Sequence, residues 1–110
     1  MSQTPKEIFE ENVRKRLKEH PDFAEKINAS YQFELTGDDG GSWAIDLSKP
    51  GGEVVVGNLA EPNVTITMTS KDFVDMIEGR LNGQMAFMQG KLKLKGDMSL
   101  ALKLQQVLGT

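Results

Sequence analysis

Cysteine is absent from this chain of 110 residues, and histidine occurs only once. Without cysteine the chain can form neither a disulfide nor a thiolate metal site. The one histidine, His20, precedes Pro21 at the end of an expected helix, so we expect it to cap that helix or to face solvent. No nucleophile motif accompanies it. The sequence therefore predicts no catalytic set, no metal site and no cofactor.

A surplus of positive charge is also missing, as are long apolar runs. The 13 lysines and arginines against 16 aspartates and glutamates give a net charge of -3. Nucleic acid is therefore not an expected partner, and any membrane contact must be local. The charged opening MSQTPKEIFEENVRKRLKEH does not resemble a secretory signal, no later run could cross a bilayer, and QQVLGT is not a peroxisomal address. We expect a cytoplasmic protein with a single domain over residues 1–110.

The first half of the chain changes from a helical to a strand-like periodicity. Thr4 and Glu7 form a capping-box pattern, which predicts a helix that ends before His20. Its single apolar stripe consists of Phe9, Val13 and Leu17. A short helix is expected over residues 22–27. Alternating apolar residues and glycine-rich turns then predict an antiparallel meander of three strands, near residues 31–36, 43–47 and 53–57.

In the second half of the chain, strand-like and helical patterns alternate. Apolar residues alternate with threonines over residues 64–69, which predicts a fourth strand, and Thr69 or Ser70 can cap the helix that follows. Gly79 is placed to end that helix, and a second short helix is expected over residues 82–89. Leu92 and Leu94 then alternate with lysines, as in a fifth strand with one buried face.

The apolar face of the last expected helix is wider than a helix packed against a core requires. After Asp97, a good N-cap, the apolar residues of the segment from Met98 to Leu108 spread over roughly 220° of the helix, whereas a core-facing helix needs an apolar arc of only about 100°. Another protein element, a ligand or a second chain could cover the excess. A helix that is simply enclosed by the core remains an equal alternative at this point.

Methionine is concentrated in the same half of the chain. Five of the six methionines follow the meander: Met68, Met76, Met85, Met88 and Met98. Unbranched, polarizable side chains suit a surface that fits ligands of varied shape, and they also fill gaps in ordinary cores. Methionine content alone favours the second interpretation.

The segment TITMTSKDFVDMIEGRLNGQMAFMQGKLKLKGDMSLALKL, Thr65 to Leu104, resembles the sterol carrier protein type 2 family of lipid-binding domains. The family pattern has a threonine-rich strand that ends in methionine, an Asp-Phe helix, an Ala-Phe-X-Gln-Gly-Lys-Leu-Lys segment and a Gly-(Asp/Asn)-Met-X-Leu-Ala-X-Lys-Leu segment. Order and spacing agree here. The stretch YQFELTGDDGGSWAIDLSKPGG is more weakly similar to the first hairpin of the family.

This resemblance implies an α+β fold in which a five-stranded, mostly antiparallel sheet and its helices enclose an apolar tunnel. Family members bind fatty acids, acyl-CoA, phospholipids and sterols. The expected function is therefore non-catalytic lipid binding or transfer, with a long-chain lipid as the ligand and transient membrane contact. An accessory domain that presents lipid to an enzyme of lipid metabolism is the alternative, and an enzyme that acts on lipids ranks third. Many relatives continue past the last helix, so a chain that stops at Thr110 would have a more open tunnel mouth.

The resemblance also implies which residues meet the ligand. Met98 and Leu102 of the last helix would face it, with Gln105 as the polar anchor for a head group, whereas Leu100 and Leu104 would face the core. The full expected set is Phe33, Trp43, Ile66, Met68, Phe73, Met76, Ile77, Met85, Phe87, Met88, Met98, Leu102 and Gln105.

Three lysines on the expected fifth strand form a positive ridge: Lys91, Lys93 and Lys95. They could attract the phosphates of acyl-CoA or an anionic membrane. Lysines also protect exposed strand edges from unwanted pairing. The sequence leaves both interpretations open.

Overall fold

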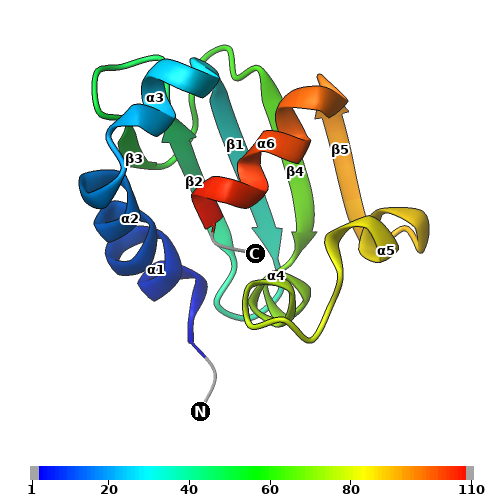
Figure 1. Cartoon of the computed structure of the whole chain (residues 1–110). Helices are drawn as coiled ribbons and strands as arrows, with labels where there is room; N and C mark the ends of the chain where they lie inside the picture. Colours follow the sequence, from blue (N-terminus) through cyan, green and yellow to red (C-terminus); the bar gives the residue numbers. More distant parts are fainter. Residues whose placement is uncertain (1–2, 109–110) are drawn as a thin grey trace.

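A five-stranded mixed sheet forms one side of the molecule (Figure 1). The computed structural model describes residues 3–108, apart from the side chains of residues 105 and 106. The strands lie in the order β3-β2-β1-β4-β5, and the β1–β4 pair is parallel whereas the other pairs are antiparallel. Their bounds are β1 (Ser30–Thr36), β2 (Gly41–Asp46), β3 (Glu53–Val56), β4 (Val64–Thr69) and β5 (Leu92–Gly96). The expected meander is confirmed as β1, β2 and β3.

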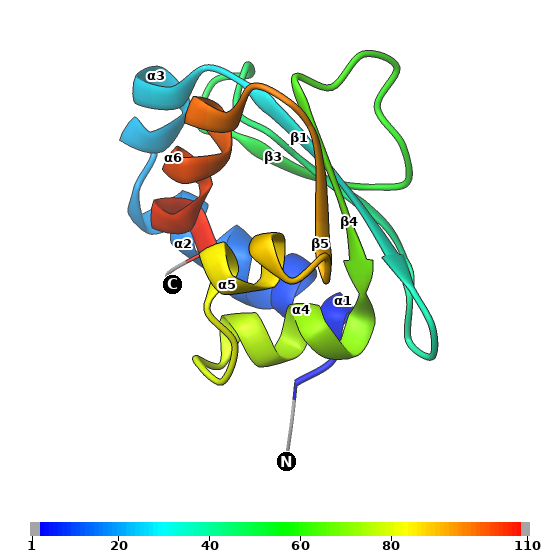
Figure 2. The same cartoon turned by 90° about the vertical axis from the view of Figure 1, so that its right-hand side faces the viewer.

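The helices gather on one face of this sheet (Figure 2). The opposite face carries the loop between β3 and β4, in which the backbone N–H of Leu59 donates to the side-chain oxygen of buried Gln32 at 2.8 Å. In chain order the helical segments are α1 (Pro5–Glu7), the π-helical η1 (Ile8–Val13), α2 (Arg14–Glu19), α3 (Asp22–Ile27), α4 (Ser70–Ile77), α5 (Gly83–Met88) and α6 (Met98–Leu108). The α+β class predicted from the sequence is confirmed.

The N-terminal helical segment begins and ends where the sequence predicts. Thr4 and Glu7 form the reciprocal capping box, and His20 is the C-cap of α2. The π-helical turns of η1 were not predicted. They bring Ile8 into the core together with the expected stripe, so the buried face is wider than the sequence pattern indicated.

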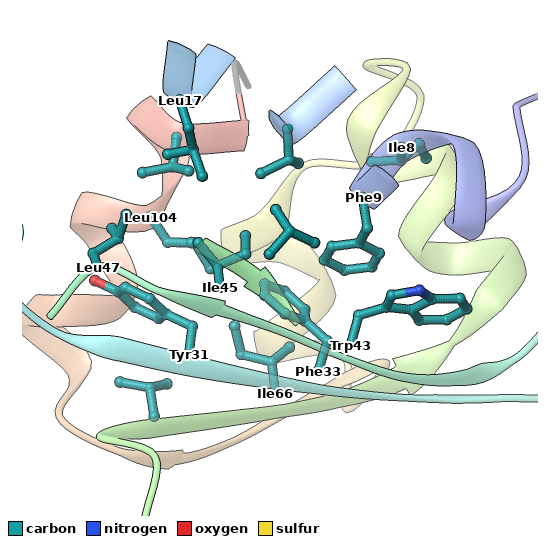
Figure 3. Close-up of a cluster of buried hydrophobic side chains, with 14 of the residues drawn as sticks. Ile8, Phe9, Leu17, Tyr31, Phe33, Trp43, Ile45, Leu47, Ile66 and Leu104 are labelled. Atoms are coloured by element: carbon teal, nitrogen blue, oxygen red, sulfur yellow. The ribbon is translucent and has the colours of Figure 1, made fainter. Parts of the chain in front are cut away.

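An aromatic cluster fills the space between this N-terminal segment and the sheet (Figure 3). The ring of Phe9 stacks on Trp43 at 5.2 Å and on Phe73 at 5.1 Å between centroids, and it meets Phe33 at 5.0 Å. All four side chains are buried. The core below η1 is therefore closely filled.

Candidate functional site

A cavity of about 690 Å³ lies beyond this cluster, between α5, α6 and the inner face of β4 and β5. Figure 2 shows these elements on the side of the molecule that faces the viewer. Most lining side chains are apolar, and Asn82 and Gln84 are the polar ones. The lining consists of Phe33, Ile66, Met76, Leu81, Asn82, Gly83, Gln84, Phe87, Met88, Leu92, Leu94, Met98, Ala101, Leu102, Leu104 and Leu108.

The strand wall follows from the alternation of β5. Leu94 lies opposite Ile66 of β4 in the register, so both side chains point to the inner face. The lysines that alternate with Leu92 and Leu94 point to the other face and are exposed. Gly96 ends the strand with φ +118, and a Cβ there would lie 2.2 Å from the carbonyl oxygen of Asn63. Only glycine fits where the chain leaves β5 for α6.

The short helix α5 forms the second wall. Asn82 caps it, because its side-chain oxygen accepts hydrogen bonds from the backbone N–H groups of Gln84 at 2.9 Å and Met85 at 3.2 Å. Ala86 is fully buried, whereas Phe87 and Met88 line the cavity and remain exposed. The helix is therefore fixed by its cap and by one small buried residue, and two of its large apolar side chains contribute to the cavity wall.

The last helix is anchored at both ends. The Tyr31 hydroxyl donates to the Leu100 carbonyl oxygen at 2.6 Å, and Arg16 Nε donates to the Val107 carbonyl oxygen at 3.0 Å. Leu104 and Val107 are buried. Met98 and Leu102, by contrast, are 47% and 51% exposed and line the cavity.

The wide apolar arc of α6 is thus divided between the core and the cavity. Leu104 belongs to both, since it is 3% exposed and also contributes to the cavity wall. Leu100 packs against the core. The assignment of Leu100 and Leu104 to the core side is confirmed, with the addition that Leu104 also reaches the cavity.

Two titratable side chains, Tyr31 and Asp97, contact the first turn of α6, and their environments shift their pKa values in opposite directions. Burial, and to a smaller degree the charge of Asp97, raises the pKa of Tyr31 to about 12. Hydrogen bonds from the side chain and the backbone N–H of Ser99 lower the pKa of the Asp97 carboxyl, which caps the helix. Neither group lines the cavity. At neutral pH the described wall of the cavity is uncharged, which suits an apolar ligand.

Seven residues of the expected ligand set line the cavity: Phe33, Ile66, Met76, Phe87, Met88, Met98 and Leu102. The structure places the others elsewhere. Trp43 and Phe73 are engaged by Phe9 in the aromatic cluster, and Met68 is buried in the core. Ile77 packs against the core, and Met85 is half-exposed on α5 outside the lining. The side chain of Gln105 lies outside the described residues.

Part of the lining was missed by sequence reasoning. Leu92 and Leu94 carried a usable signal, because their alternation with lysines already marked them as the inner face of a strand. The segment 81–84 carried none. It lies in the connection between α4 and α5 and at the first residues of α5, where no periodicity shows which side faces inward.

Other candidate sites do not assemble in the described residues. His20 stacks on Phe23 at 4.8 Å and is not part of the cavity lining. Across residues 3–108, as far as the structure describes them, no group of three His, Cys, Asp or Glu side chains is placed to hold a metal ion. No helix in the described part of the chain is long and apolar enough to cross a membrane.

The comparison with protein families decides the classification. The model of the SCP-2 sterol transfer family matches residues 10–109. The chain belongs to the SCP-2 sterol transfer family. Curated relatives of this family member include hydroxysteroid dehydrogenase-like protein 2 of Homo sapiens, which is 47% identical over 88 residues, or 79% of this chain and 21% of the relative. The chain therefore spans about a fifth of the length of that relative.

Solved structures of the family match nearly the whole chain. Palmitated SCP2L2 from Aedes aegypti is 29% identical with a TM-score of 0.75, and the match covers 98% of this chain and 96% of that one. Sterol carrier protein 2 from Aedes aegypti in complex with the C16 fatty acid palmitate is 25% identical with a TM-score of 0.76 over the same shares. Lipid-binding domains of this family thus share the fold, and two of these relatives were solved with palmitate.

Proposed function

We propose that this chain is a single lipid-binding domain over residues 1–110 that carries a long-chain acyl lipid in the cavity between α5, α6 and β5, and that it does not convert this lipid chemically. The observation that carries the proposal is the apolar cavity itself. Its volume of about 690 Å³ lies within the range of roughly 300–1,000 Å³ that is typical of small-molecule sites. The palmitate in the two related structures supports an acyl chain as its occupant.

Burial of the acyl chain supplies the affinity. Each buried methylene contributes about 0.8 kcal/mol before the entropic cost of binding is subtracted. The wall has aliphatic and methionine side chains on several elements, so one acyl chain can contact the sheet, α5 and α6. Met76, Met88 and Met98 can change rotamer to fit ligands of different shape. We expect dissociation constants in the micromolar range or tighter, which corresponds to about -8 kcal/mol.

The head group needs a polar partner at the opening. The side-chain oxygen of Asn82 is already engaged as the α5 cap, whereas Gln84 is exposed and lines the cavity. Gln105 remains the second proposed anchor. It follows Ala101 by four positions and precedes Leu108 by three, and both of those residues line the cavity, so helical spacing supports its place at the wall.

The chemistry of the lining supports binding without turnover. A hydrolase needs a nucleophile or activated water, a general base and oxyanion donors in one place. The described lining combines apolar side chains with two amides, which do not titrate. This supports a carrier over an enzyme.

A second function is favoured by the curated relatives. Their names describe dehydrogenase-like and multifunctional enzymes, in which the matched region is about a fifth of the protein. The same domain could therefore present its lipid to an enzyme of lipid metabolism. Both functions require the cavity to be filled by lipid.

The test is titration with a fluorescent fatty acid and with acyl-CoA, together with native mass spectrometry of the purified protein. Ala101→Phe should narrow the cavity and weaken binding, because Ala101 lines the wall. Ala60→Phe is the matched control, since Ala60 is exposed in the loop between β3 and β4. Full binding by folded Ala101→Phe would contradict the site. Saturable hydrolysis that survives repurification would contradict binding without turnover.

A further inference from the structure

A row of inner-face residues crosses the sheet beneath the cavity. In the strand registers Leu94 pairs with Ile66, and Ile66 pairs with Phe33. Phe33 in turn pairs with Trp43. Because paired residues point to the same face of a sheet, the row is continuous from β5 to β2. Leu94, Ile66 and Phe33 line the cavity, whereas Trp43 does not, so the cavity stops between Phe33 and Trp43.

The side chain of Phe9 covers the next position of this row (Figure 3). Its ring stacks on Trp43 at 5.2 Å with only 10° between the ring planes, and it meets Phe33 at 5.0 Å. Phe9 is completely buried. Its ring therefore occupies the place into which the cavity would continue along the row.

The surroundings of Phe9 would form an apolar wall for such a continuation. Phe33, Trp43 and Phe73 each contact the Phe9 ring, and all three are buried. The Nε1 atom of Trp43 is buried and has no hydrogen-bond partner among the described residues. Ring packing rather than a hydrogen bond therefore holds the indole, and an acyl chain in place of Phe9 would break no hydrogen bond of Trp43.

The segment that carries Phe9 is fixed at its beginning. The capping box of Thr4 and Glu7 closes the first turn. The backbone N–H of Gln3 donates to Glu78 Oε2 at 3.1 Å, and Glu78 is the C-cap of α4. These bonds connect the N-terminal segment to the helix beside the cavity. Phe9 is thus a fixed wall and not a mobile plug.

We propose that Phe9 is the end wall of the lipid cavity and sets the length of acyl chain that the cavity can bury. This inference rests on the proposed function and adds a residue that determines specificity. With the head group near Gln84 at the opening, the methyl end of the lipid advances along the row to Phe33. If Phe9 is trimmed, the lipid passes Phe33, or Phe33 turns into the vacated space and leaves its own place to the lipid. Both rearrangements lengthen the cavity.

The first experiment titrates the full chain with a series of saturated fatty acids from lauric to behenic acid. Wild-type affinity should rise with chain length until the lipid reaches Phe9, and then level off. Phe9→Ala should move this limit to longer acids. The affinity of an acid beyond the wild-type limit, relative to one below it, should increase about tenfold, since each further buried methylene strengthens binding by up to about fourfold.

A milder variant keeps the proposal testable if Phe9→Ala does not fold. Phe9→Leu keeps an apolar side chain in the core and shortens the wall by less. Its limit should move in the same direction by a smaller amount, with a relative gain of about fourfold for the next longer acid.

Trp43 provides a second measurement, because it is the one tryptophan of the chain. Bromine quenches tryptophan fluorescence at short range, so a fatty acid brominated at its methyl end reports how near that end comes to the indole. Quenching at saturation should be stronger in Phe9→Ala than in the wild type. A purely structural role of Phe9 would lower stability without bringing the bromine closer to Trp43.

Phe23→Leu is the matched control. It removes the same atoms as Phe9→Leu from a ring that is also buried, but Phe23 stacks on His20 at 4.8 Å and does not line the cavity. This control should keep the chain-length limit and the bromine quenching of the wild type.

Three outcomes would overturn the inference while leaving the proposed function in place. The first is an unchanged chain-length limit in folded Phe9→Leu. The second is equal bromine quenching in the wild type and Phe9→Ala, since the lipid would then already reach Trp43. The third is an equal shift of the limit in Phe23→Leu, which would indicate a general loosening of the core. If the wild type bound no acid of the series, the proposed function itself would be refuted, and this inference with it.

Discussion

Leu102 and Leu104 lie two residues apart on α6, and their environments predict losses of stability of very different size for the same substitution. Leu102 is 51% exposed, so Leu102→Gln forfeits at most about half of the roughly 1.5–3 kcal/mol that a fully buried leucine contributes, or about 1 kcal/mol. Its amide can reach water in the opening. Leu104 is 3% exposed. Leu104→Gln loses most of that burial and adds roughly 1–3 kcal/mol for an amide without partners, or about 3–5 kcal/mol in total.

The substitutions should not affect lipid affinity in the same order as they affect the free energy of unfolding. Leu102→Gln should weaken binding of a purely apolar lipid by about tenfold, since it places an amide beside the acyl chain at a cost on the order of 1–2 kcal/mol. Val13→Ala completes the comparison, because Val13 is buried in the core and does not line the cavity. It should lower stability without changing the affinity of the folded fraction.

The assays are urea unfolding and displacement of a bound fluorescent fatty acid. If Leu102→Gln and Leu104→Gln lost equal, large amounts of stability, Leu102 would be a core residue. The assignment of this side of α6 to the ligand would then have to be abandoned. Unchanged affinity of a stable Leu102→Gln variant would refute the proposed ligand position in a different way, since the cavity wall would remain while its occupant would lie elsewhere.

Two further predictions concern the groups that hold α6. Tyr31→Phe removes the hydrogen bond to the Leu100 carbonyl oxygen and should lower the free energy of unfolding by about 1–2 kcal/mol near neutral pH. Because burial raises the Tyr31 pKa from 10.0 to about 12, the wild type should also lose stability as pH rises through this window, and unfolding measured over a pH series should show no such component in the variant. Asp97→Ala should lower Tm more than Asp97→Asn, because asparagine keeps the acceptor for the Ser99 backbone N–H. The lowered Asp97 pKa means that the advantage of the wild type over Asp97→Ala should persist above pH 3.8 and disappear in more acidic solution, as thermal melts can test.

Local signals in the sequence predicted most elements of the fold. The Thr4–Glu7 capping box, the Asp97 cap and the alternation in β4 and β5 depend on residues close together in the chain, and each appears as expected. The π-helical turns of η1 and the parallel pairing of β1 with β4 were not predicted. The pairing depends on which distant strands become neighbours, and hydrophobic periodicity does not contain that information.

The candidate site was predicted only in part, because periodicity does not show which distant elements become neighbours. An inward-facing apolar residue can contact either protein or ligand, and its own periodicity is the same in both cases. Trp43 and Phe73 point inward as expected, yet Phe9 reaches them from the N-terminal segment and occupies the space where a ligand was expected. Which inward residues meet a cavity depends on what the other elements insert, and that depends on tertiary packing.

The position of the cavity follows from the sizes of the side chains on the inner face of the sheet. At the end below η1, three aromatic rings of β1, β2 and α4 surround the ring of Phe9, and this end is filled. Toward β4 and β5 the inner residues are aliphatic, such as Ile66 and Leu94, and the one buried residue of α5 is the small Ala86. No aromatic residue of η1 or α2 is among the described residues that line the cavity. Phe33 lies at the boundary, since it contacts Phe9 on one side and lines the cavity on the other. The same helical layer therefore packs tightly at one end of the sheet and leaves room at the other, without any change in the fold.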